Sequence, residues 1–229
     1  MRDILPTEVL DRLRNRYVAG IDDAVANYDH SSADEDSLTG ALGQAISMRI
    51  PELFSTARGN FQIKIDYQKI RGRGKNAPEK RYGSDGLFQI EVLDIFGQSI
   101  RKKALPFQSK KNWRGTNSAL ASQAAKMIVE TDGGIVIDFT RGGYFACSAK
   151  AVVRADGKRG LAHSAGEIFQ LGQLLGTDFL ECRIGTVGMF YERATETYQW
   201  LLAPAHLITT TIRFQSSRQD QTKQSYAGQ

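Results

Sequence analysis

An aspartate, a glutamine and a lysine occupy positions that two paired strands would bring together. If Gly97 is the centre of a hairpin, Asp85 lies twelve residues before it and Ser109 twelve residues after it. Asp85 would then begin one strand where the partner strand ends. Alternate residues share a face of a strand, so Gln108 and Lys110 should project together. The prediction depends on the register, because a slip by one residue turns the side chains to the other face.

These groups are suited to metal-assisted hydrolysis of a phosphodiester. A carboxylate, an amide oxygen and a backbone carbonyl are the hard oxygen ligands that Mg²⁺ takes, while it keeps several waters. Lys110 would orient an attacking water or offset charge on a phosphoryl oxygen. Glu35 is a further candidate metal ligand, because Leu38 and Leu42 share its helix face and would dock that helix against the sheet.

Hydrophobic periodicity and turn residues predict the elements around these side chains. Helices are expected over about Glu8–Ala26, from near Asp34 to before Pro51, over Ser118–Val129 and over Gly166–Leu175. Strands are expected at 61–70, 87–94, 102–111 and 133–140, then at 179–185, 187–194 and 206–214, while 144–153 is compatible with a strand or a helix. This order predicts an α/β fold with a mixed central sheet flanked by helices and additional C-terminal α/β elements.

The composition is that of an ordinary soluble globular chain, with 229 residues, 41% hydrophobic and 24% charged. Apolar stretches are too short to span a bilayer, so we expect no membrane association. The N-terminal segment has mixed charges and no apolar core of a signal peptide. Cys147 and Cys182 are far apart, which argues against a disulfide scaffold or a zinc finger and favours a reducing, cytoplasmic location.

The positive charge is concentrated in one part of the chain. Between Phe61 and Gly115 there are 13 Lys or Arg and 5 Asp or Glu, against a net charge of +5 for the whole protein. Such a segment favours a polyanion partner, although a solvated basic loop is the alternative. The candidate nucleic-acid-binding residues are Arg71, Arg73, Lys75, Lys111 and Arg114. Trp113, just after the lysines, is compatible with stacking on a base or with packing in the core.

The segments SDGLFQIEV and LPFQSKK resemble the PD-(D/E)xK nuclease superfamily, in the variant with Gln in the Glu position, as in Mrr-type restriction endonucleases. The resemblance covers about Asp34 to Ala149 and implies a restriction-endonuclease-like fold. It implies that Asp85 binds metal, that Gln108 takes the second metal-facing position and that Lys110 is the catalytic lysine. Glu35 corresponds to the first-helix glutamate. The sequence departs from the family in having Ser-Asp-Gly instead of Pro-Asp and Gln instead of an acid.

The resemblance implies one nuclease domain over residues 1–215, with a core at about 34–150, a C-terminal extension at 151–215 and a disordered tail at 216–229. The expected activity is a Mg²⁺-dependent endonuclease, with Mn²⁺ as an alternative ion, acting on double-stranded DNA in restriction or anti-phage defence. The expected assembly is a homodimer or higher homo-oligomer, with a possible partner subunit of a defence system. Alternatives are a catalytically silent nucleic-acid-binding or assembly subunit and a nucleotide-activated effector nuclease.

Each candidate residue also has an ordinary structural explanation. Asp85 precedes Gly86 and would suit a turn. Lys110 and Lys111 would suit an edge strand that discourages aggregation. Glu35 would suit the first turn of a helix, where the helix dipole favours an acid. The three-dimensional arrangement decides between these structural explanations and a site that the residues share.

Overall fold

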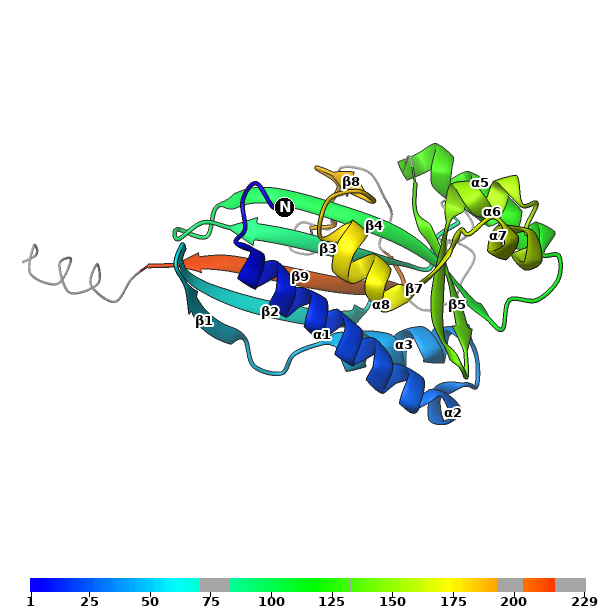
Figure 1. The fold of residues 1–229 in the computed structure, drawn as a ribbon, viewed down its shortest axis with the longest axis horizontal. Helices are drawn as coiled ribbons and strands as arrows, with labels where there is room; N and C mark the ends of the chain where they lie inside the picture. Colours follow the sequence, from blue (N-terminus) through cyan, green and yellow to red (C-terminus); the bar gives the residue numbers. More distant parts are fainter. Residues whose placement is uncertain (71–82, 132, 193–203, 217–229) are drawn as a thin grey trace, which may run out of the picture.

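A computed structural model describes residues 1–70, 83–131, 133–192 and 204–216, and shows a mixed α/β fold built on one curled sheet (Figure 1). The strands lie in the order β1-β2-β9-β3-β4-β5-β6-β7, with β8 paired to β4. Their bounds are β1 Glu52–Thr56, β2 Gly59–Lys69, β3 Gly86–Leu93, β4 Ser99–Lys111, β5 Ile135–Thr140, β6 Gly143–Ser148, β7 Ile168–Gln170, β8 Thr186–Val187 and β9 His206–Gln215.

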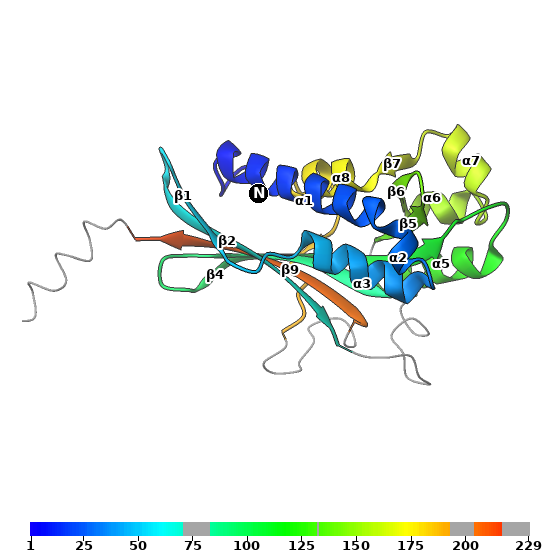
Figure 2. The same cartoon turned by 90° about the horizontal axis from the view of Figure 1, so that it is seen from below.

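Helices cover the two faces of this sheet. They are α1 Thr7–Ala26, α2 Tyr28–Ser31, α3 Glu35–Ile46, α5 Ser118–Thr131, α6 Ala149–Arg154, α7 Arg159–Ser164, α8 Leu171–Leu174 and the π-helix Leu175–Phe179. Helices α1, α3 and α8 lie together on one side of the sheet (Figure 2), where they share the larger hydrophobic core with β2, β3, β4, β5 and β9. A second core joins α5, α6 and α7 to β5 and β6. The α/β class predicted from the sequence is confirmed.

The two N-terminal helices form where the apolar spacing predicts them. In α1, buried Leu10, Leu13, Tyr17 and Ile21 recur at intervals of three or four residues and face the sheet. Helix α3 begins after Asp34, whose carboxylate accepts a hydrogen bond from the Ser37 N–H at 2.8 Å and caps the helix. This cap determines which residues form the first turn of α3.

The β3–β4 hairpin contains a bulge that sets the register of the candidate site. Gly86 pairs with Phe107 and the ladder continues regularly to Val92, after which β4 carries one extra residue. As a consequence, Asp85 lies opposite Gln108, and the Asp85 N–H donates to the Phe107 carbonyl at 2.8 Å. A symmetric hairpin about Gly97 would instead place Asp85 opposite Ser109. Directly opposite residues share a face of the sheet, so the observed register, and not the symmetric one, places Asp85 on the face of Gln108 and Lys110.

Strand β9, from the C-terminal part of the chain, lies in the middle of the sheet. It pairs antiparallel with β2 and parallel with β3, so it separates two strands that follow one another in the sequence. Residues beyond 151 therefore contribute a strand between β2 and β3, in addition to the helices and short strands near β6. The short strand β1, which the periodicity does not reveal, extends the sheet beyond β2.

The structure corrects several expectations for the C-terminal part. The predicted helix over Gly166–Leu175 is divided between the short strand β7 and helix α8, because alternating contacts with β6 compete with the helical pattern. The predicted strand at 179–185 is wrong, since the π-helix and turns occupy this region. Of the predicted strand at 187–194, residues 193 and 194 lie outside the described residues, and among 187–192 only Val187 belongs to a strand. Segment 144–153, left open between a strand and a helix, belongs to β6 and then to α6. The predicted tail lies outside the described residues except for its first residue. Within the described ranges, no helix is long and apolar enough to cross a membrane.

Candidate active site

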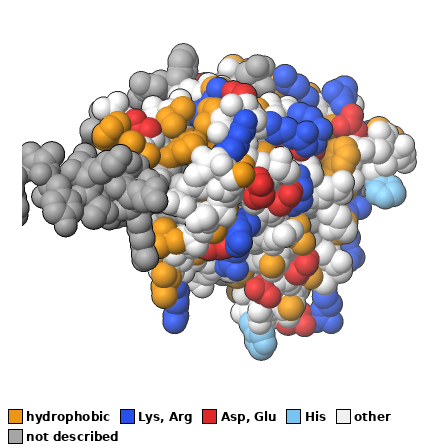
Figure 3. Space-filling view, turned by 60° about the vertical axis from the view of Figure 1, so that its left-hand side comes forward, with side chains coloured by type: hydrophobic (Ala, Val, Ile, Leu, Met, Phe, Trp, Pro, Cys, Tyr) orange, Lys and Arg blue, Asp and Glu red, His pale blue; other side chains and the backbone are white. Residues whose placement is uncertain are grey.

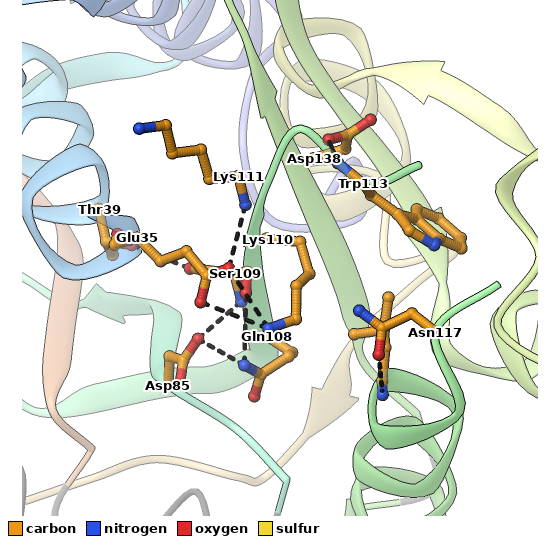
Figure 4. Close-up of polar contacts among 11 residues, drawn as sticks. Glu35, Thr39, Asp85, Gln108, Ser109, Lys110, Lys111, Trp113, Asn117 and Asp138 are labelled. Atoms are coloured by element: carbon orange, nitrogen blue, oxygen red, sulfur yellow. Dashed lines mark hydrogen bonds and ion pairs between the residues drawn. The ribbon is translucent and has the colours of Figure 1, made fainter. Parts of the chain in front are cut away.

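One edge of the sheet gathers the side chains that the sequence analysis singled out. The starts of β3 and β9 and the ends of β2 and β4 meet there, and the first turn of α3 crosses above them (Figure 4). Asp85 comes from the residue before β3, Gln108 and Lys110 from the end of β4, and Glu35 from α3. The structure thus brings together four residues from three elements separated by long stretches of chain.

Asp85 and Gln108 are in direct contact. One carboxylate oxygen of Asp85, Oδ2, accepts hydrogen bonds from Nε2 of Gln108 at 2.8 Å and from the Ser109 N–H at 2.7 Å. The Gln108 side chain is buried, with 1% of the residue exposed. Its Oε1 has no hydrogen-bond partner among the described residues. A buried amide oxygen without a partner is costly, so this atom marks a place where a ligand would be favourable.

Lys110 and Glu35 form the other half of the site. The Lys110 ammonium lies 3.3 Å and 3.4 Å from the two carboxylate oxygens of Glu35. The backbone N–H of Lys111 also donates to Glu35, at 3.2 Å. Both charged side chains are partly exposed, at 20% for Lys110 and 35% for Glu35. The pair is therefore held in place and still accessible to a ligand from solvent.

Ser109 and Thr39, which the sequence analysis missed, join α3 to β4. Their hydroxyl oxygens lie 2.9 Å apart in the buried interface, and the Thr39 hydroxyl also contacts the Glu35 carbonyl at 2.7 Å. The contact fixes α3 one turn after Glu35. Strand alternation could have indicated this role of Ser109, because its side chain must face the opposite side of β4 from Gln108 and Lys110.

A second buried polar cluster, also missed, lies beside the first. Nε2 of His206 contacts the Asp36 carboxylate at 2.9 Å, and Nδ1 contacts the Tyr67 hydroxyl at 2.9 Å. Asp36 also accepts a hydrogen bond from Lys69. The His206 N–H donates to the Asp85 carbonyl at 3.2 Å. His206 thereby links the first turn of α3 to the residue that begins the Asp85 site.

Burial governs the ionisation of this second cluster. Desolvation lowers the pKa of His206, against the opposing effect of Asp36. Desolvation raises the pKa of Tyr67 to about 12. Partial burial alone would raise the pKa of Asp36, but hydrogen bonds from Lys69 and His206 outweigh it and lower that pKa. A charged Asp36 bound to a neutral histidine and a lysine is a satisfied structural group.

The candidate nucleic-acid-binding residues are only partly described. Arg71, Arg73 and Lys75 lie outside the described residues. The Lys111 ammonium donates to the Ser32 carbonyl, away from Asp85, while Arg114 is exposed. Trp113 is only 3% exposed, and its ring N–H donates to the Gly157 carbonyl at 3.0 Å, so it packs in the core.

Charge on the outer surface is mixed where it can be inspected. Figure 3 brings forward the end of the molecule that carries β1, and its basic side chains have acidic ones beside them. The charged groups that could act together chemically lie elsewhere, at the sheet edge that carries Asp85 and Lys110.

The donor set at this edge suits a hard divalent ion with water among its ligands. Among the described residues there is no group of three or more His, Cys, Asp and Glu side chains placed to hold a metal. Two carboxylates, from Asp85 and Glu35, and the Gln108 amide are within the same cluster. Turning the amide by half a rotation exchanges Nε2 and Oε1, so that oxygen instead of nitrogen faces Asp85. Mg²⁺ commonly binds through one or two carboxylates and retains waters, so this set fits it.

Comparisons of the chain with models of protein families, with curated proteins and with solved structures find no match. The site must therefore be interpreted from its own geometry.

Proposed function

We propose that the protein is a metal-dependent endonuclease that hydrolyses phosphodiester bonds in double-stranded DNA and resembles the PD-(D/E)xK nucleases. The observation that carries the proposal is the contact set at one sheet edge: Asp85 against Gln108, and Lys110 against Glu35. A turn-forming aspartate and edge-strand lysines would not require a buried glutamine beside them whose amide oxygen has no hydrogen-bond partner among the described residues.

The order of elements supports the proposal. Helix α3, strands β1 and β2, the β3–β4 hairpin, helix α5 and strand β5 follow one another, and β5 lies parallel to β4. The resemblance extends to this order, because the helix over Ser118–Val129 and the strand GGIVIDFT resemble the helix and central strand that complete the superfamily core. The insertion of β9 between β2 and β3 is a feature of this chain.

In this proposal, Asp85, Gln108 and Glu35 hold Mg²⁺ or Mn²⁺ together with water. When bound, the ion supplies Lewis-acid polarisation of a phosphoryl oxygen and a more acidic bound water. Asp85 remains oriented by the Ser109 N–H, which bonds the same oxygen that faces Gln108. The neutral amide of Gln108 contributes less charge than a glutamate, so we expect weaker metal affinity than a site with a third carboxylate.

Lys110 would stabilise charge on the phosphate and orient the attacking water. Its ammonium lies beside Glu35 without being enclosed, so a phosphoryl oxygen can share it. Preorganised cations of this kind stabilise the charge that develops in the transition state. Glu35 keeps the ammonium aimed at the cluster through its own bond to the Lys111 N–H.

Plasmid cleavage in Mg²⁺ or Mn²⁺ tests the proposal. Wild type should cleave, while Asp85→Asn and Lys110→Met should be inactive with unchanged circular dichroism and thermal unfolding. Asp156→Asn and Lys126→Met, at exposed positions, are matched controls and should cleave like wild type. Cleavage by all five proteins at equal rates would refute the assignment.

The same assay separates the alternatives. A wild type that retards DNA on a gel but does not cleave DNA or RNA would support a silent binding subunit. Activity that requires an added nucleotide would support an effector nuclease. Activity on RNA alone would change the substrate and leave the site assignment in place.

A further inference from the structure

A cavity of about 310 Å³ opens beside the candidate active site, at the ends of β4 and β5. Its lining includes Asn112, Trp113, Arg114, Asp138, Thr140 and Arg159. The chain enters this lining directly after Lys110 and Lys111, the last residues of β4. The cavity is referred to below as the Arg159 cavity.

The Arg159 cavity and the candidate active site lie on adjacent strands of the sheet. Lys110 of β4 and Asp138 of β5 are Cα partners in the parallel ladder. Adjacent strands lie about 4.8 Å apart, so the two residues stand side by side. Figure 4 shows Asp138 and Trp113 next to the Lys110 strand, on the side away from Asp85.

The Arg159 cavity is built around a buried ion pair. The Asp138 side chain is 3% exposed, and its Oδ2 accepts a hydrogen bond from Nε of Arg159 at 2.7 Å. Its Oδ1 accepts one from the Trp113 N–H at 2.8 Å. Arg159 is 27% exposed, so its guanidinium reaches from the buried carboxylate towards the opening.

Stability alone gives a weak reason for such a pair. The desolvation of two charges offsets most of their attraction, so a buried ion pair often contributes little to folding. The pair is, however, an effective way to orient an arginine. The bond to Asp138 uses one of the five N–H donors of the guanidinium, and an arginine held by one edge can present its other edge to an anion.

The loop of the Arg159 cavity is also held rigidly. The Trp113 ring N–H donates to the Gly157 carbonyl at 3.0 Å, and the Arg159 N–H donates to the Gly115 carbonyl at 3.2 Å. Gly115 has a φ of 59°, a conformation that glycine adopts without strain. These bonds keep exposed Arg114 on the same opening as Arg159.

We propose that the Arg159 cavity binds a backbone phosphate of the nucleic acid, adjacent to the phosphate that Asp85 and Lys110 would address. Arg159 and Arg114 together outweigh the single charge of Asp138 and leave one net positive charge, which matches a phosphodiester. The proposal rests on the proposed function for the identity of the ligand. It adds a site that holds the strand beyond the scissile bond and takes part in no bond-breaking step.

Binding without turnover tests this proposal. The affinity of a fluorescent DNA duplex is measured by anisotropy in Ca²⁺ over a range of salt concentrations. Arg114→Gln and Arg159→Gln should each weaken binding by about 5–10-fold and reduce the salt-dependence slope by about 1, as expected for loss of one phosphate contact. Arg154→Gln, at an exposed arginine on α6 outside the cavity lining, is the matched control and should bind like wild type.

The thermal unfolding of each variant is measured as well, because Arg159→Gln leaves Asp138 buried without its charged partner. Arg114 is exposed, so Arg114→Gln decides the question if Arg159→Gln lowers the melting temperature. The proposal is overturned if Arg114→Gln keeps the affinity and salt slope of wild type, if Arg154→Gln weakens binding equally, or if wild type does not bind DNA. Cleavage is measured separately. If wild type binds DNA without cleaving it and Arg114→Gln weakens that binding, the phosphate site is supported and the nuclease assignment is refuted. If cleavage depends on Asp85 but Arg114→Gln binds DNA like wild type, the nuclease assignment is supported and the phosphate site is refuted.

Discussion

Two adjacent acids at the start of α3 differ in how the fold uses them. Glu35 turns towards β4, where its contacts with Lys110 and the Lys111 N–H are 3.2–3.4 Å long. Asp36 turns towards β9 and β2, where His206 and Lys69 bind it closely. Successive residues of a helix point about 100° apart, so neighbours in the sequence reach different strands.

The difference separates a solvent-accessible charged pair from a cluster anchored on a buried histidine. The Glu35 side contains an accessible ammonium and the Oε1 of Gln108, which no described residue binds. On the Asp36 side, His206 is 2% exposed and both of its ring nitrogens have partners. We interpret the Glu35 side as the place for a ligand and the Asp36 side as the support that holds α3 above it.

The largest expected effect tests the Glu35 side directly. Lys110→Met should reduce the cleavage rate by about 10³-fold, because removal of one preorganised charge from a transition state commonly costs this much. Stability should change little, since the ammonium is partly exposed. Single-turnover cleavage and thermal unfolding measure the two quantities. A large loss of stability with retained activity would reverse the interpretation of the two sides.

The two acids can be compared by matched substitutions. Glu35→Gln should raise the Mg²⁺ concentration needed for half-maximal cleavage by about 10–100-fold, at wild-type stability. Asp36→Asn should instead lower the free energy of unfolding by about 1–3 kcal/mol, because it weakens the hydrogen bond to the buried His206 ring. Metal titrations and urea unfolding of both variants test the contrast. Identical Mg²⁺ titrations and identical unfolding curves for the two variants would show that the two acids do not differ in role.

A third charged residue shows what burial costs without a ligand site. Lys103 lies on β4 like Lys110, but it is fully buried, and desolvation lowers its pKa to about 8 from an ordinary 10.5. Between these values the unfolded chain holds more protons than the folded one, so stability should rise with pH. We expect wild type to gain about 2 kcal/mol relative to Lys103→Met between pH 8 and pH 10. Parallel stability curves for the two proteins, measured by urea unfolding, would contradict this.

The smallest expected effect concerns cooperation within the Asp36 side. A double-mutant cycle of Asp36→Asn and His206→Gln should give a coupling energy of about 1 kcal/mol, because the two side chains share a buried hydrogen bond. The readout is urea unfolding of the four proteins. Pairing Asp36→Asn with Lys126→Met, on the distant helix α5, should give no coupling. Additive energies for Asp36 and His206 would mean that the contact does not stabilise α3.

The sequence predicts the parts of this molecule that depend on local patterns. Apolar spacing reveals α1 and α3, alternation reveals the β3–β4 hairpin, and the distances from Gly97 bring Asp85 near Gln108 and Lys110. The bulge after Val92 changes the register by one residue, and no local signal marks it. The observed register places Asp85 and Gln108 on one face, and the backbone N–H of Ser109 bonds the same carboxylate oxygen of Asp85.

Non-local pairing limits the prediction elsewhere. The alternation of β9 identifies it as a strand, but its place between β2 and β3 depends on partners more than a hundred residues away in the chain. The contacts of His206 with Asp36 and Asp85 depend on the placement of β9, so the sequence does not predict them either. In the region around the π-helix, apolar residues fill gaps beside α1 without a regular period.

The central position of β9 has a consequence during synthesis. The ribosome releases the chain from its N-terminus, and β2 and β3 emerge long before the strand that joins them. Until residue 215 has left the exit tunnel, the carbonyl of Asp85 lacks the His206 N–H and α3 lacks its anchor on β9. A nascent chain therefore contains Asp85, Gln108 and Lys110 before β9 is available, and the sheet edge that carries them is completed only when β9 inserts between β2 and β3.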